Sequence, residues 1–114
     1  MVQAAAVDDV FYALSSATRR QVLAQLSAGP ATVSELAAPF DMKLPSFVQH
    51  LSVLERSRLV TSSKQGRVRT YEIAPEPFKL AEDWLSEQRR VWEGRLDRFD
   101  HYVKQLKERE QGHE

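Results

Sequence analysis

The segment DMKLPSFVQHLSVLERSRLV, residues 41–60, decides the fold of this chain. Its apolar residues recur every three or four positions, the period of an amphipathic α-helix. They are Leu44, Phe47, Val48, Leu51 and Leu54. The opposite side is small or hydrogen-bonding and almost free of charge at its start: Pro45, Ser46, Gln49 and Ser52. Solvated helix faces usually carry many charged residues, so this face is typical of a helix that contacts a partner.

Two shorter helices are predicted before this segment. Residues 7–15 have a helical apolar period, and a second helix follows them. Thr18 and Gln21 have the spacing of a capping box at the start of that second helix, and Gly29 is placed to stop it.

A third helix repeats the same start signal directly before residue 41. Thr32 and Glu35 have the capping-box spacing, and Pro39 keeps this helix short because proline has no backbone N–H. Pro45 then lies in the first turn of the amphipathic helix, where proline is tolerated. Two helices joined by a short turn predict a helix-turn-helix over about residues 32–57.

The apolar period changes after residue 58. The stretch LVTSSKQGRVRTYEI, residues 59–73, has β-branched and aromatic residues on both sides of Gln65-Gly66. This pattern predicts a β-hairpin with strands at about 59–64 and 67–73. Tyr71 and Ile73 share one face of the second strand, and we expect that face to pack on the core.

A long helix is predicted from about residue 77 to 109. Its apolar positions are Ala81, Trp84, Leu85, Trp92, Leu96, Phe99, Val103 and Leu106. Such a helix is about 50 Å long, and a small core cannot cover an apolar stripe of that length. Exposed apolar stripes usually mark an interface, and the simplest partner is a second copy of the chain. Aromatic residues here could instead line a ligand pocket, but at helical spacing a dimer core is the better interpretation.

Composition narrows the class of protein. The 114 residues suit a single domain, and the net charge is zero. Residues 43–71 nevertheless hold six basic residues against one acid, while residues 75–114 hold eight basic and ten acidic residues. No cysteine is present, and no apolar run approaches the ~20 residues of a membrane span. The first residues lack the basic start and apolar stretch that are typical of a signal peptide. We therefore expect a cytoplasmic protein with a basic patch.

The order of these elements predicts a mainly α fold with a small β-hairpin wing, a winged helix-turn-helix that lays its second helix in the major groove. Gln49 can bond to adenine and Ser46 to most bases, while Pro45 and Ser52 leave the approach open. His50 lies at the edge of the same face. The candidate phosphate contacts are Lys43, Arg56, Lys64, Arg67 and Arg69.

Several motifs together resemble the ArsR-type (arsenic-repressor-like) winged-helix transcriptional repressors. They are TRRQVLAQL, ATVSELA, MKLPSFVQHLSVLE, LV and GRVRTYEI, over about residues 8–74. The resemblance implies a homodimer built mainly from the first and last helices, an inverted-repeat operator of double-stranded DNA, and repression by occluding a promoter. It places Ser46, Val48, Gln49 and His50 at base-facing positions. The candidate dimer residues are Phe11, Leu14, Trp84, Trp92, Leu96, Phe99 and Val103.

The metal sites of that family are not matched here. Its founding members use cysteines near the positions of Leu36, Ala37 and Ala38, which cannot ligate. Another family site uses Asp and His pairs on the last helix. Asp97 and His101 could hold zinc or nickel only with residues of a second subunit, so a solvated face is the better interpretation and we expect no cofactor. No effector ligand is identified.

Other classes of function are weaker. No set of nucleophile, base and acid has an informative spacing, and no glycine-rich phosphate loop exists, so we expect no enzyme. The main alternative is a winged helix that binds another protein rather than DNA. The basic stretch at 43–71 speaks against it. Val53 lies on the polar side of its helix by angle and is expected to contact either the wing or a thymine methyl group.

Overall fold

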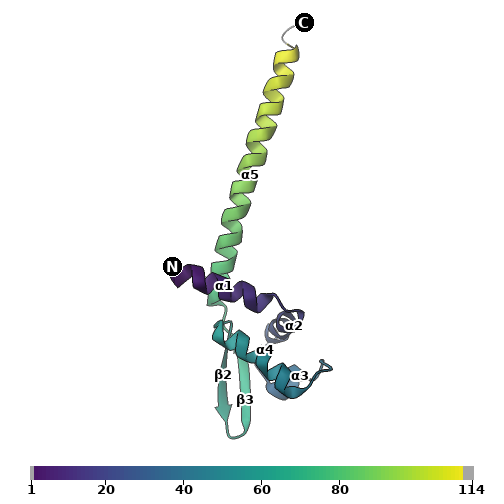
Figure 1. Ribbon diagram of the computed structural model, residues 1–114, viewed down its shortest axis with the longest axis vertical. Coiled ribbons are helices and arrows are strands. Elements are labelled where there is room, and N and C mark those ends of the chain that lie inside the picture. Colours follow the sequence, from purple (N-terminus) through teal and green to yellow (C-terminus); the bar gives the residue numbers. More distant parts are fainter. Residues whose placement is uncertain (1, 112–114) are drawn as a thin grey trace. The chain divides into compact units, whose positions relative to one another are not determined.

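The computed structural model describes residues 2–111, with side chains from residue 5 onward, and separates into two compact units. One unit ends at Ala81 and the other begins at Glu82. The first unit contains α1 (Val2–Leu14), α2 (Ala17–Leu26), β1 (Ala31–Thr32), α3 (Val33–Ala37), α4 (Leu44–Arg56), β2 (Val60–Gln65), β3 (Val68–Ile73) and the start of α5 (Glu76–Gln111) (Figure 1). The predicted class is confirmed: a mainly helical chain with a hairpin wing and a long last helix. The first helix begins at Val2 rather than at residue 7.

The starts of α3 and α4 follow the sequence signals. The Glu35 N–H donates to Thr32 Oγ1 at 3.2 Å, and the Thr32 N–H donates to Glu35 Oε1 at 3.0 Å, so the predicted capping box is present. These bonds pair two of the amide groups that a helix start leaves without partners. They also lower the pKa of the Glu35 carboxyl, chiefly through the Thr32 backbone bond. Pro45 lies in the first turn of α4 as predicted.

The capping box predicted at Thr18 and Gln21 is wrong. Ser16 is the N-cap of α2, and its hydroxyl accepts the Arg19 N–H at 3.3 Å. Ser16 has an extended backbone, which an N-cap requires, whereas Thr18 is already inside the helix. The chain therefore passes from α1 to α2 within two residues, which brings the end of α1 close to the first turn of α2.

The sheet contains one strand that the sequence did not suggest. Its order is β1-β3-β2, and both pairings are antiparallel. In the hairpin, Val60 pairs with Ile73 and Gln65 with Val68, so residues 66 and 67 form the turn. Gly66 has a φ of 61°, which the first central residue of a type II′ turn requires. The two-residue strand β1 pairs with Thr70 and Tyr71 at the base of the wing.

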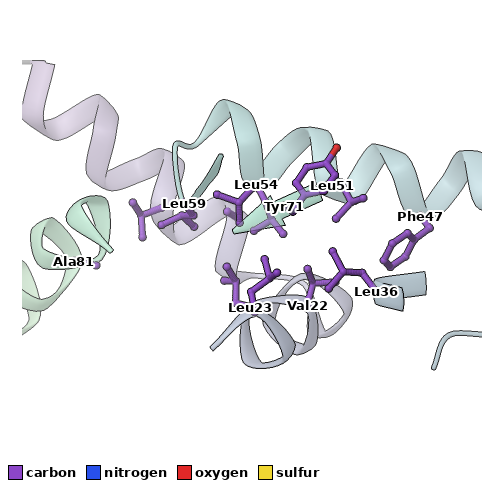
Figure 2. Close-up of a cluster of buried hydrophobic side chains, with 13 residues drawn as sticks. Val22, Leu23, Leu36, Phe47, Leu51, Leu54, Leu59, Tyr71 and Ala81 are labelled. Atoms are coloured by element: carbon purple, nitrogen blue, oxygen red, sulfur yellow. The ribbon is translucent and has the colours of Figure 1, made fainter. Parts of the chain in front are cut away.

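The core of the first unit lies between α2, α4 and the base of the sheet (Figure 2). Helix α4 contributes three fully buried side chains, Phe47, Leu51 and Leu54, which lie on one narrow stripe. Tyr71 is buried, and Ile73 packs against the same cluster, so the predicted core face of the wing is confirmed. Burial raises the pKa of the Tyr71 hydroxyl. Full burial of one large apolar side chain, such as Phe47 or Leu51, contributes about 1.5–3 kcal/mol to the free energy of folding.

Three other residues of α4 differ from the expectation. Leu44 and Val48, assigned to the apolar side, are 55% and 39% exposed. The reason is that Phe47, Leu51 and Leu54 already fill the contact with the core, and Leu44 lies in the first turn, beyond it. Val53 is partly buried and packs against the core cluster, which places it with the packing residues.

The second unit consists of α5 from Glu82 onward, and its apolar stripe is uncovered. Large apolar side chains that are 40–63% exposed follow its length: Trp84, Leu85, Val91, Trp92, Leu96, Phe99, Tyr102 and Leu106. Val103 is of intermediate exposure. We call Trp92, Leu96, Phe99, Val103 and Leu106 the α5 stripe. Within the described chain, no helix has both the length and the apolar character that a bilayer span needs.

Candidate DNA-binding surface

The outer face of α4 is polar and open. Pro45, Ser46, Gln49 and Ser52, predicted to read bases, are all exposed there. The Ser52 hydroxyl donates to the Val48 carbonyl at 3.1 Å, one turn back in the same helix. Among the described residues, the Gln49 amide has no hydrogen-bond partner. A carboxamide that both donates and accepts is therefore available to a ligand at the centre of this face.

The start of α4 differs from the starts of α2 and α3. Lys43 is its N-cap residue and makes no side-chain capping bond, whereas Ser16 and Thr32 cap the other two helices. Its first backbone N–H groups consequently lack a side-chain acceptor, at the positive end of the helix dipole. An exposed lysine beside such a helix end favours an anion such as a phosphate group.

The wing places positive charges at its tip. Lys64 and Arg69 are directly opposite each other on the two strands, and Arg67 lies in the turn between them. All three are exposed. Directly opposed residues of an antiparallel pair have side chains on the same face, and like charges in that position destabilise the pair. Two cations side by side at this exposed tip therefore favour an anion bound there.

A chain of hydrogen bonds links the wing to α4. Arg69 donates to Ser62 Oγ at 2.8 Å, and the Ser62 hydroxyl donates to Glu55 Oε2 at 2.7 Å. Glu55 is the one acidic residue of the basic stretch 43–71. Because Ser62 lies between them, the carboxylate holds the wing against the end of α4. Arg56, beside Glu55, is exposed as the phosphate prediction requires.

Arg19 is a residue that the sequence analysis did not assign to the site. It is only 7% exposed, and its Nε donates to the Ala13 carbonyl at 2.7 Å. Its Nη2 donates to the Tyr12 carbonyl at 2.9 Å, and its guanidinium lies 5.1 Å from the centre of the Tyr12 ring. Its Nη1 lies 3.1 Å from His50 Nδ1. One side chain of α2 thus joins the end of α1 to α4.

The sequence did contain a signal for this burial. Arg19 precedes Val22, Leu23 and Leu26 by three, four and seven residues, which puts it on the buried stripe of α2. Arg20, by contrast, is exposed. A buried arginine needs several acceptors, and the carbonyl groups that end α1 supply two of them.

His50 lies at the edge of the polar face, with an intermediate exposure. Burial, and then the positive charge of Arg19, lower the pKa of its imidazole below 6.5. Both causes favour the neutral imidazole over the charged one. The prediction that His50 reads a base is compatible with this position, because only one ring nitrogen is bound to Arg19.

The remaining predicted residues lie on α1 and α5. Phe11 and Leu14 are partly buried against the core of the first unit. Asp97 and His101 are exposed on α5, and His101 Nε2 is 3.2 Å from Gln105 Nε2. The part of the chain that the structure describes holds no group of three or more metal-ligating side chains. The expectation that Asp97 and His101 form a solvated face and that the chain holds no cofactor stays a prediction.

Comparison with known proteins identifies the family. Residues 14–63 match the family model of a helix-turn-helix domain. A crystal structure of an ArsR family transcriptional regulator is 56% identical, with a TM-score of 0.75 over 77% of this chain and 91% of that chain. The chain belongs to the ArsR family of transcriptional regulators. An ArsR-like regulator from Rhodococcus sp. RHA1 is 28% identical over 84% of this chain and 91% of its own, with a TM-score of 0.70.

Two further relatives extend the comparison. The HTH-type transcriptional regulator Rv2034 of Mycobacterium tuberculosis is 38% identical over 68 residues, which are 60% of this chain and 64% of that protein. The transcriptional repressor SdpR of Bacillus subtilis is 27% identical over 69% of this chain and 88% of its own. The family resemblance inferred from the motifs is confirmed. Membership of a family of transcriptional regulators also confirms that the chain is a DNA-binding regulator rather than an enzyme.

Proposed function

We propose that this ArsR family member is a homodimeric repressor that binds an inverted-repeat operator. The observation that carries the proposal is the exposed α4 face with its unpaired Gln49 amide, together with the uncapped helix start at Lys43 and the basic wing tip of the same unit. An α-helix with such a face fits the major groove, and the cations around it fit the phosphates on either side.

The α5 stripe supports the dimer. Its side chains have no cover within the described chain, and a two-fold pairing of this helix with that of a second copy would bury them. A two-fold dimer presents two copies of α4 in opposite directions, so the matching DNA site is an inverted repeat. SdpR, a relative of this chain, is named a repressor, which supports repression over activation. We place the protein in the cytoplasm, with the DNA that it binds.

Fluorescence anisotropy tests this function. The probes are a labelled duplex from upstream of the gene that encodes the chain, a duplex enriched by the protein from a randomised library, and a scrambled duplex of equal length. Each is titrated at several salt concentrations. We expect tight, salt-dependent binding to the first two probes, with two chains per site, because phosphate contacts release counterions.

Matched variants separate base reading from general attraction. Gln49→Ala removes the exposed amide of α4, and Gln21→Ala makes the same change at an exposed position of α2. We expect the first variant to lose preference for the enriched duplex and the second to keep it. Equal, weak binding of the wild type to every duplex would reject the operator proposal and favour the alternative of a protein-interaction module.

A further inference from the structure

We propose that Arg19 is a positioning residue that holds the proton of the His50 imidazole on Nε2, so that α4 presents a fixed N–H donor to a hydrogen-bond acceptor of the bound DNA. This inference rests on the proposed function, because His50 lies on the same surface. Arg19 is buried and lies outside that surface, but it determines which hydrogen-bonding group His50 presents there.

The assignment of the proton follows from what a guanidinium can do. Arginine donates hydrogen bonds and accepts none, so the 3.1 Å contact between Arg19 Nη1 and His50 Nδ1 requires a lone pair on Nδ1. A neutral imidazole carries one proton. With Nδ1 as the acceptor, that proton is on Nε2, and the ring is a donor at its other nitrogen.

The guanidinium is itself held in one orientation. Its Nε and Nη2 donate to the Ala13 and Tyr12 carbonyls at 2.7 and 2.9 Å, and its plane lies over the Tyr12 ring. These contacts use separate N–H groups of a rigid planar fork, so the group that faces His50 cannot rotate away without breaking them. The end of α1 therefore fixes the direction of the bond to α4.

The Nε2 atom of His50 is accessible to a ligand. No described residue bonds to it, and among described side chains the one buried nitrogen or oxygen atom without a partner is Gln25 Oε1. A buried Nε2 without a bond would belong with Gln25 Oε1 among the buried atoms that lack a partner, and it does not. His50 Nε2 is therefore not buried, and it reaches solvent. His50 follows Ser46 by four residues, so its ring lies on the same side of α4 as that candidate for base reading.

A fixed donor selects the chemistry of its partner. In the major groove it fits the acceptors of guanine, the N7 of adenine or the O4 of thymine, and it does not fit the amino group of cytosine. A phosphate oxygen offers the same acceptor chemistry. The inference is that His50 donates to DNA, and the experiment distinguishes the base edge from the backbone.

Nuclear magnetic resonance tests the position of the proton. Long-range 1H–15N correlation on the 15N-labelled full chain at neutral pH reports which ring nitrogen is protonated, and His50→Asn identifies the signals of His50 by their loss. We expect the Nε2–H form in the wild type and a mixture of both forms in Arg19→Lys, which keeps the charge but loses the fork. A wild-type ring protonated on Nδ1 would overturn the proposal.

DNA binding tests the role of the donor. His50→Asn keeps an acceptor near the Nδ1 position for Arg19 but removes the outward donor, whereas His50→Gln places an amide near Nε2 and removes the acceptor. On the duplex that the wild type enriches from a randomised library, we expect His50→Asn to fold normally and bind roughly ten-fold more weakly. Loss of preference at a single base position indicates a base contact, and an equal loss on all sequences indicates a phosphate.

A double variant distinguishes positioning from mere stabilisation. If Arg19 acts through His50, Arg19→Lys in the His50→Asn background should weaken DNA binding no further than His50→Asn alone. Additive losses would mean that Arg19 supports the fold and nothing more. If His50→Asn bound DNA as tightly as the wild type, the inference about Arg19 and His50 would be rejected, while the proposed repressor function would stand. Enrichment of no sequence by the wild type would reject the proposed function and the DNA contact together.

Discussion

Replacing Phe99 by alanine measures how far the α5 stripe holds two chains together. Phe99 is 63% exposed, and an aromatic side chain offers about 200 Å², so about 125 Å² of it is in contact with water. Covering this area contributes about 3 kcal/mol per chain at ~25 cal/mol per Å². In a two-fold dimer the position occurs twice. Even if the partner covers only half of the area, the loss is about 3 kcal/mol, or about 100-fold in the dimer dissociation constant.

Analytical ultracentrifugation across a concentration series measures that constant. Lys104→Ala is the matched control, because it truncates an exposed side chain of α5 outside the α5 stripe. Far-ultraviolet circular dichroism shows whether each variant keeps its helix. We expect Phe99→Ala to dissociate at a much higher concentration than the wild type and the control to match the wild type. A wild type that stays monomeric throughout would refute the dimer, and an unchanged constant in Phe99→Ala would refute the stripe as its interface.

Three further outcomes are expected from the DNA surface. Gln49→Ala should weaken operator binding by about 1–3 kcal/mol and relax preference at one base position, and an equal loss on operator and scrambled DNA would exclude base reading. Arg67→Ala should weaken binding to every sequence and flatten the log–log salt dependence by about one unit, and an unchanged slope would remove Arg67 from the phosphate contacts. Because burial and Arg19 lower the pKa of folded His50 below 6.5, its stabilising contribution is complete above pH 6.5 and is lost as the pH falls through the lower folded value. Thermal melting against pH should show this loss in the wild type and not in His50→Asn.

Local chemistry made most of the fold predictable. The buried α4 stripe of Phe47, Leu51 and Leu54, the Thr32–Glu35 box and the hairpin each depend on residues within one or two turns of chain, and all three are present in the structure. The hairpin turn lies one residue later than predicted, at residues 66 and 67 instead of 65 and 66, because Gly66 takes the first central place in it. The exposed polar face of α4 followed from the same periodicity, because residues that do not fit a core are left outside it.

The missed features depend on contacts between distant residues. Arg19 and His50 are 31 positions apart, and nothing near either of them specifies the bond. The strand β1 exists because Thr70 and Tyr71 come alongside it, and two residues carry no strand pattern of their own. Ser16 is the cap in place of Thr18 because α1 ends at Leu14 and Ser16 has the extended backbone that an N-cap requires, which capping-box spacing alone does not reveal.

The position of β1 makes the wing adaptable. Its pairing fixes the hairpin at Thr70 and Tyr71, whereas residues 64–68 contribute nothing to the core cluster. Mutations that change the charges of this tip therefore leave the core cluster untouched. If the wing tip contacts the DNA backbone as proposed, affinity for that backbone can evolve at the tip in a lineage of such regulators, while α4 and the fold that carries it stay the same.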